Sequence, residues 1–256
     1  MSTPMLTISN LVMRFGGITA LNDVSFSLAQ GQITSLIGPN GAGKTTLFNC
    51  ITGMYTPTSG QVQFNKQDIT GLAAHQIALQ GMARTFQNLA LFGGLSVLEN
   101  LMTGAYLKGS SGLLQGVFTS PQARREERAA KVAAMDMLAF LDMQDVADAL
   151  PSELSYGRQK QVEFARALMQ QSKLVLLDEP MAGMSSAEKD SMSALIQKVR
   201  HTLGVSFLIV EHDIPVVMDL SDKIVVLDFG QKIAEGLPQE IQNDPAVIAA
   251  YLGSEH

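Results

Sequence analysis

The sequence predicts an α/β fold with a parallel central sheet, and three observations support this prediction. Residues 38–46 read GPNGAGKTT and match the pattern G-x-x-x-x-G-K-[ST] of a phosphate-binding loop. An apolar run at 32–37 precedes the loop, and a helical pattern at 44–53 follows it. In the second half of the chain, aliphatic runs typical of buried parallel strands alternate with helical patterns. The runs lie at 174–177, 206–210 and 223–227, and a helical pattern at 187–203 ends at Gly204.

The phosphate-binding loop offers both backbone and side-chain groups to an anion. Its glycines permit left-handed backbone conformations, so successive N–H groups can point inward. Lys44 is placed to reach the β- and γ-phosphates, and the Thr45 hydroxyl to bind Mg²⁺. The alternative is a chance glycine loop, which the correct flanks disfavour. The predicted nucleotide-binding residues here are Gly38, Asn40, Gly41, Gly43, Lys44, Thr45 and Thr46.

Alternating patterns around the loop predict an additional, antiparallel β layer. Apolar and polar residues alternate at 6–15, 24–28 and 60–69. A helix is then expected at 73–81, and a strand at 82–86 that ends at Gln87.

From about residue 95 to 170 the chain has helical character. Residues 123–141 combine charges with apolar residues at helical spacing, which predicts a helix with a solvated face. Residues 108–120 are rich in glycine and serine and predict a loop. This loop is unusually apolar at four positions, Leu113, Leu114, Val117 and Phe118. We expect these side chains either to pack into the core or to contact a partner. We expect one domain, 1–256, with a nucleotide-binding core at 1–87 and 171–256 and a helical subdomain at 88–170.

Composition narrows the function classes. The chain has 256 residues and a net charge of −6. This negative charge disfavours a nucleic-acid-binding protein, in which a basic surface is expected. The N-terminus lacks a secretory signal pattern, and no apolar run is long enough to span a membrane. The single cysteine, Cys50, fits a small core residue and a reducing, cytosolic setting.

Two carboxylates follow the aliphatic run at 174–177. Asp178 and Glu179 lie at the carboxyl end of a predicted parallel strand, where ligands of open α/β sheets bind. Asp178 can hold Mg²⁺, directly or through water. Glu179 can polarise a water for attack on the γ-phosphate.

Residues 154–159, LSYGRQ, precede a predicted helix at 159–169. Ser155 has two interpretations, a simple helix N-cap or part of a second phosphate site. One chain with one phosphate loop needs only one such pocket. A second pocket makes sense if it serves the nucleotide held by another copy.

The motifs and their order resemble the ATP-binding subunits of ABC transporters, over nearly the whole chain. The resemblance implies that ATP and Mg²⁺ are the cofactors. It also implies three catalytic residues: Glu179, His212 of the VEHD motif, and Gln87. Gln87 would also sense Mg²⁺, beside Thr45 and Asp178. Phe15 would stack on adenine, and Ser155 and Gly157 would close on the partner subunit's ATP.

Within this family the chain resembles the branched-chain amino acid importer group. The features are MRFGG near the start, ARTFQN around Gln87, the LSYG form of the signature, VEHD and the terminal AYLG. The same resemblance extends to importers of urea or other small amides and, more loosely, to the ATPase that drives lipopolysaccharide extraction. A non-transport ABC ATPase acting on DNA or ribosomes is a rival that the acidic balance disfavours. A module that holds ATP without hydrolysis is a third alternative, and the intact Asp178, Glu179 and His212 argue against it.

Two positions depart from the family pattern. Ser185 stands where Asp or Asn is usual, which puts coupling between the two composite sites in doubt. Ser185 and Glu188 also fit a capping box, S-x-x-E, that opens the next helix. Arg158 replaces the usual glutamine, and either contacts phosphate across the dimer or points to solvent.

The resemblance implies a peripheral ATPase at the cytoplasmic face of the inner membrane. Its expected partners are transmembrane permease subunits, a second ATPase subunit (identical or homologous, with a heterodimer favoured) and, indirectly, a periplasmic or extracellular solute-binding protein.

Overall fold

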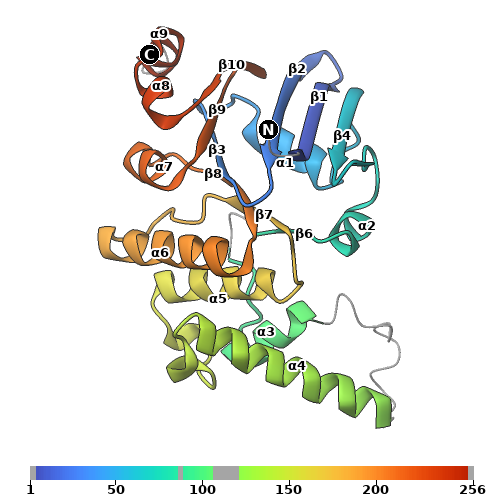
Figure 1. Cartoon of the computed structure of the whole chain (residues 1–256), viewed down its shortest axis with the longest axis vertical. Coiled ribbons are helices and arrows are strands. Elements are labelled where there is room, and N and C mark those ends of the chain that lie inside the picture. Colours follow the sequence, from blue (N-terminus) through green and yellow to red (C-terminus); the bar gives the residue numbers. More distant parts are fainter. Residues whose placement is uncertain (1–3, 86–88, 106–120, 253–256) are drawn as a thin grey trace.

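The structure is a computed structural model of the whole chain, and it describes residues 4–85, 89–105 and 121–252. Two sheets and a group of helices make up the fold (Figure 1). The predicted Gln87 and the apolar residues at 113–118 lie outside the described residues.

The central sheet has six strands in the order β10-β9-β3-β8-β7-β6. The strands β9, β3, β8, β7 and β6 run parallel, and β10 pairs antiparallel with β9 at one edge. This confirms the predicted parallel sheet. The strands are β3 (Ile33–Ile37), β6 (Met82–Arg84), β7 (Leu174–Asp178), β8 (Ser206–Val210), β9 (Lys223–Asp228) and β10 (Gln231–Gly236).

The predicted antiparallel layer is a separate four-stranded sheet in the order β2-β1-β4-β5. Its strands are β1 (Pro4–Phe15), β2 (Ile18–Ala29), β4 (Ser59–Phe64) and β5 (Gln67–Asp68). The alternating run at 60–69 is two strands rather than one. Asn65 and Lys66 turn the chain between them with φ values of 48° and 67°.

Alternate residues of the central strands pack on opposite faces, as the pleat of a strand requires. Leu176 and Leu208 share a buried cluster with the antiparallel sheet and with α1 (Lys44–Ile51). Val175 and Phe207 instead pack in the cluster formed with the helical subdomain and α6 (Ser186–Leu203). Cys50 lies in the first cluster, and burial raises the pKa of its thiol to about 11, which confirms a core role.

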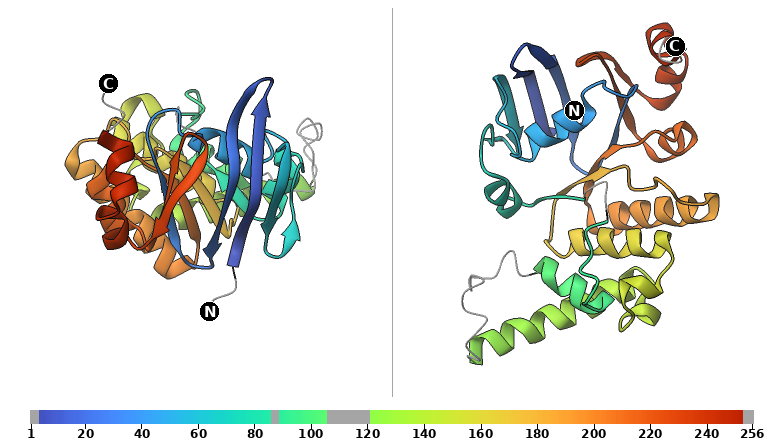
Figure 2. Two further views of the ribbon diagram at one scale, coloured as in Figure 1. Left: turned by 90° about the horizontal axis from the view of Figure 1, so that it is seen from above. Right: turned by 180° about the vertical axis from the view of Figure 1, so that it is seen from behind.

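The helical subdomain lies on the side of the central sheet opposite the antiparallel layer (Figure 1). It contains α3 (Val97–Ala105), α4 (Pro121–Phe140), the short 3₁₀ helices η3 (Gln144–Val146) and η4 (Pro151–Glu153), and α5 (Tyr156–Leu168). The C-terminal helices and the N-terminal strands lie at opposite sides of the molecule (Figure 2).

Several helices differ from the predictions. The helix expected at 73–81 is the shorter α2 (Ala74–Leu79). The helix expected at 159–169 begins earlier, at Tyr156, because Ser155 caps it. Two short helices were not predicted, α7 (Ile214–Leu220) and α8 (Pro238–Gln242), and each has a proline in its first turn. The chain's last described element is the helix α9 (Pro245–Leu252). The stop of α6 at Gly204, with φ of 66°, agrees with the prediction.

Candidate functional site: a phosphate loop and a second helix N-terminus

The phosphate loop joins β3 to α1, and its glycines adopt conformations that other residues rarely adopt. Gly38 has φ of 147°, and a Cβ there would lie 2.0 Å from the carbonyl oxygen of Leu227. Gly43 has φ of 99°, and its Cβ would lie 2.7 Å from the carbonyl oxygen of Ala20. The backbone of the neighbouring strands therefore fixes the loop, and only glycine fits these two positions.

Lys44 lies in a buried position at the start of α1. Its Nζ donates hydrogen bonds to the carbonyl oxygens of Gly38 at 2.6 Å and Pro39 at 2.9 Å. Burial lowers the pKa of Lys44, while the carboxylates of Glu179 and Asp178 oppose that shift. The N-cap of α1 is Gly43, which has no side chain that could accept a hydrogen bond. The first N–H groups of the helix, which have no partner within the helix, therefore have no side-chain cap.

A cavity of about 520 Å³ opens in front of the loop. The residues around it come from β2, from the phosphate loop, from the ends of β7 and β8, and from the turn after β9. They include Asn40, Gly41, Gly43, Lys44, Thr45, Thr46, Glu179, His212, Ile18, Thr19 and Phe229. The fold therefore brings most of the predicted phosphate-loop residues together with Glu179 and His212.

Glu179 and His212 face each other at this cavity. Nε2 of His212 lies 2.7 Å from Oε1 of Glu179. Glu179 holds a left-handed conformation with φ of 50°, and its N–H donates to the carbonyl oxygen of Val210 at 2.9 Å. A non-glycine residue in this region is strained, and such strain is typical of functional sites.

Asp178, the last residue of β7, is 5% exposed and forms an ion pair with Arg84 at 2.8 Å. The Asp178 carboxylate and the Thr45 hydroxyl are hard oxygen donors, which suit Mg²⁺. Within the described ranges no three His, Cys, Asp or Glu side chains converge as a metal cage.

Phe15 ends β1 and is 42% exposed. Its ring lies edge-on against Tyr55, with the ring centroids 5.3 Å apart. Phe15 is not one of the residues that the structure places around the phosphate-loop cavity, whereas Ile18 and Phe229 are. Its predicted adenine contact stays a prediction.

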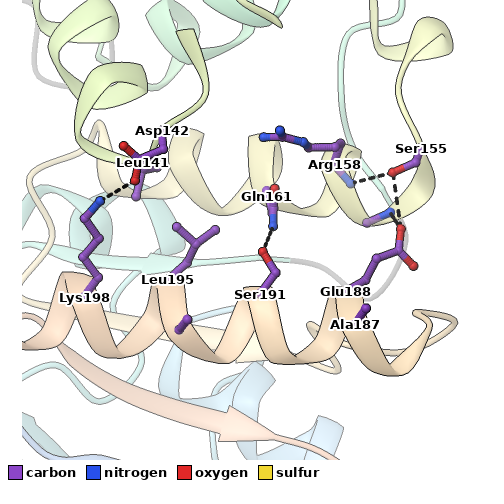
Figure 3. A pocket seen from close by; sticks show the side chains of 12 residues that line it. Leu141, Asp142, Ser155, Arg158, Gln161, Ala187, Glu188, Ser191, Leu195 and Lys198 are labelled. Carbon is purple, nitrogen blue, oxygen red and sulfur yellow. Dashed lines mark hydrogen bonds and ion pairs between the residues drawn. The ribbon is translucent and has the colours of Figure 1, made fainter. Parts of the chain in front are cut away.

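Ser155 and Gly157 lie elsewhere, beside a groove of about 520 Å³ between α5 and α6 (Figure 3). The Ser155 hydroxyl accepts a hydrogen bond from the N–H of Arg158 at 3.3 Å, so the N-cap interpretation is correct. Arg158 pairs loosely with Asp145, at 3.7 Å, on the surface. Since this helix N-terminus and the phosphate loop border different hollows, one chain does not close both around the same ligand in this conformation.

A carboxylate of the same chain already occupies the donors at the start of α5. Oε1 of Glu188 accepts from the Gly157 N–H at 3.2 Å and from the Ser155 hydroxyl at 3.3 Å (Figure 3). Oε2 accepts from the N–H and the hydroxyl of Ser185, which confirms the predicted capping box. The hydrogen bonds from Ser185, more than those from Ser155 and Gly157, lower the pKa of Glu188.

Sequence reasoning missed two polar residues next to the site. Glu211 is 4% exposed and accepts hydrogen bonds from the N–H of Met181 at 2.9 Å and of His212 at 3.1 Å. It thus joins the loop after Glu179 to the residue that carries the imidazole, and burial raises the pKa of its carboxyl. Arg84 is the other. Glu211 belongs to the VEHD motif and Arg84 to the ARTFQN motif. The resemblance assigns a role only to the histidine of the first motif and the glutamine of the second.

This fold and this loop define a phosphate-loop α/β protein with a helical subdomain. A family model described as "ABC transporter" matches residues 21–182. A second model, "Branched-chain amino acid ATP-binding cassette transporter", matches residues 231–256. The chain belongs to the ABC transporter ATP-binding family.

Similar proteins agree with this family. The chain is 43% identical over 253 residues to the high-affinity branched-chain amino acid transport ATP-binding protein BraF of Pseudomonas aeruginosa, with 99% of each covered. It is 42% identical, with the same coverage, to LivG of Escherichia coli, which bears the same description. The crystal structure of the ADP conformation of MJ1267, an ATP-binding cassette of an ABC transporter, superposes with a TM-score of 0.86 at 35% identity, covering 98% of this chain and all of that one.

The fold class and the resemblance to the branched-chain amino acid group are therefore confirmed. Among the described helices, none has both the length and the apolar character needed to cross a membrane.

Proposed function

We propose that this chain is the ATP-hydrolysing subunit of a membrane importer for branched-chain or other small neutral amino acids. The observation that carries the hydrolytic part is the Glu179–His212 pair at the cavity of the phosphate loop. The substrate class comes from the names of the relatives and from the family model that matches the C-terminus.

Nucleotide binding falls to the phosphate loop. The N–H groups around Gly41 and Gly43 and the N-terminus of α1 bind the phosphates of ATP. Lys44 gives up its bonds to the loop carbonyls and pairs with the β- and γ-phosphates. The Thr45 hydroxyl and the Asp178 carboxylate would hold Mg²⁺, which would supply positive charge beside the phosphates.

Hydrolysis falls to Glu179 and His212. The Glu179 carboxylate accepts a proton from a water molecule as the water oxygen attacks the γ-phosphorus. The bond from the γ-phosphorus to the bridging oxygen breaks, and ADP and inorganic phosphate leave. His212 orients Glu179 and donates a hydrogen bond to the γ-phosphate. Gln87 would contact Mg²⁺ and help to position the attacking water.

The second half of the site comes from a second ATPase subunit, identical or homologous. Its start-of-helix donors, equivalent to Ser155 and Gly157 here, bind the γ-phosphate held by this chain. Closure of the two ATPase subunits around ATP is transmitted to permease subunits at the cytoplasmic face of the membrane. A solute-binding protein delivers the amino acid to the permease from the other side.

Uptake of labelled leucine, with labelled urea in parallel, tests this proposal in cells that lack the protein. The cells are complemented with wild type, with Glu179→Gln or with Glu240→Gln. Glu240 is a matched control because its carboxylate accepts the Leu237 N–H at the start of α8, and it is not among the residues around the phosphate-loop cavity in the described part of the chain. We expect wild type and Glu240→Gln to restore leucine uptake, and Glu179→Gln to leave it at the deletion level.

Each other outcome contradicts a defined part of the proposal. Leucine uptake restored by Glu179→Gln would remove Glu179 from catalysis. A change in urea uptake alone would overturn the substrate class. No change in either uptake would overturn the importer assignment.

A further inference from the structure

Arg84 makes an unusual set of contacts in the core of the nucleotide-binding region. It is the last residue of β6 and precedes Gln87 by three positions. Its Nη2 donates to Oδ2 of Asp178 at 2.8 Å. Its Nη1 donates to Oδ1 of Asn49 at 2.6 Å and to the Thr52 hydroxyl at 3.2 Å. One guanidinium therefore joins three elements: β6, β7 and α1.

This contact is buried and sterically defined. The side chains of Arg84 and Asp178 are 9% and 7% exposed, so water does not screen the pair. The guanidinium carbon lies 5.5 Å from the centre of the Phe48 ring, which adds a cation–π contact on α1. The guanidinium presents its donors to Asp178 and Asn49 as a rigid planar fork, whereas a lysine offers a compact ammonium on a flexible stem and does not reproduce this geometry.

The elements that Arg84 joins are the two that supply the metal donors. Thr45 lies in the first turn of α1, and Asp178 ends β7. Mg²⁺ requires nearly ideal octahedral geometry, so its two protein ligands need a fixed separation. Within the described part of the chain, Arg84 is the only side chain bonded to the Asp178 carboxylate. It holds Oδ2 and leaves Oδ1 for the metal or a metal-bound water.

We propose that Arg84 is a positioning residue for Mg²⁺. It braces the Asp178 carboxylate against α1, so that Asp178 and Thr45 keep the separation that the ion needs. This inference rests on the proposed function, since it takes these two residues as the metal donors.

The test measures nucleotide binding rather than hydrolysis. The chain has no tryptophan, so binding of ATP that carries an N-methylanthraniloyl fluorophore can be followed without an intrinsic indole signal. Affinity is measured without metal, and the Mg²⁺ concentration that gives half of the metal-dependent change is then determined. We expect Arg84→Lys to raise this Mg²⁺ midpoint about tenfold, the loss of roughly 1.4 kcal/mol of metal binding. The metal-free affinity should stay within about twofold of wild type.

Arg200→Lys is the matched control. Arg200 also pairs with an aspartate, Asp222, at 2.9 Å, and its Nε donates to the backbone carbonyl of Gly31 at 2.8 Å. It joins α6 to the residues just before β3 and β9, at the N-terminal ends of these parallel strands, whereas Asp178 is the last residue of β7. We expect Arg200→Lys to lower the melting temperature as Arg84→Lys does, and to leave the Mg²⁺ midpoint unchanged.

The outcomes separate the inference from its foundation. An unchanged Mg²⁺ midpoint in Arg84→Lys would overturn the positioning role. So would an equal loss of metal-free and metal-bound affinity, because that result describes a purely structural residue. A wild-type chain that fails to bind the nucleotide would instead overturn the proposed function, and this inference with it.

Discussion

The phosphate loop and the start of α5 are both candidates to bind phosphate, but their donors are in different states. At the phosphate loop, the backbone of neighbouring strands fixes the glycines, and the donors face an open cavity. At the start of α5, the donors of Ser155 and Gly157 already bind the Glu188 carboxylate, and Ser155 is exposed while Gly157 is buried. The first region is preformed for a ligand, whereas a ligand at the second has to displace an anion of the same chain.

The difference follows from what holds each region. Gly38 and Gly43 are fixed by contacts with Leu227 and Ala20, which belong to the two sheets. Ser155 and Gly157 instead bond the side chain of Glu188, which is half-buried and belongs to the capping box of α6. We therefore expect changes in the first region to affect folding and changes in the second to affect ligand competition.

The largest effect should come from Gly38→Ala. The new Cβ would meet a backbone oxygen at 2.0 Å in a conformation with φ of 147°, so the strand or the loop has to shift. We expect a loss of about 3 kcal/mol or more in the free energy of unfolding, measured by urea denaturation.

Gly204→Ala is the control for this loss. Gly204 also has a positive φ, 66°, but a Cβ there would meet nothing within 4 Å. Its cost should be about 1 kcal/mol, from the left-handed conformation alone. Similar losses in the two variants would show that contact with Leu227 does not fix the loop.

An intermediate effect is expected from Glu188→Gln. Glutamine keeps the capping geometry but removes the negative charge that competes with phosphate at Ser155 and Gly157. In the assembled transporter, the ATP concentration for half-maximal hydrolysis should fall about two- to fivefold, the range for an exposed charge. Glu240→Gln, with the same capping role elsewhere, should not change it. A rise instead of a fall would mean that Glu188 assists nucleotide binding.

The smallest effect concerns Glu211 and pH. Burial raises the pKa of this carboxyl above the value of 4.5 that it has in the unfolded chain, despite its hydrogen bonds and the nearby His212. The folded state then favours the protonated form, so this contribution is present below pH 4.5 and is lost as the pH rises through the folded pKa.

We therefore expect the stability of wild type relative to Glu211→Gln to decrease as the pH rises above 4.5. Urea denaturation of both proteins across this window measures the decrease. A difference that grows with pH would show that the ionised carboxylate is the preferred native form.

The sequence was sufficient for the features that depend on local patterns. Glycine spacing located the phosphate loop, aliphatic runs located β7, β8 and β9, and the S-x-x-E spacing located the cap of α6. These features depend on residues close together in the chain.

The features that could not be predicted depend on long-range contacts. Arg84 meets Asp178 across 94 positions, and Glu188 meets Gly157 across 31. No periodicity links such residues, so the sequence does not show which of them meet in the fold. The short helices α7 and α8 were missed because their few residues carry too little periodicity.

The most direct test of the two-part site is Ser155→Arg, in which a bulky side chain blocks the exposed start of α5. The isolated chain is assayed for binding of the fluorescent ATP, and cells that carry the variant are assayed for leucine uptake. Because the phosphate loop does not depend on Ser155, binding should stay within about twofold of wild type, while uptake falls to the level of Glu179→Gln. A parallel loss of ATP binding in the isolated chain, or normal uptake, would contradict a site divided between two subunits.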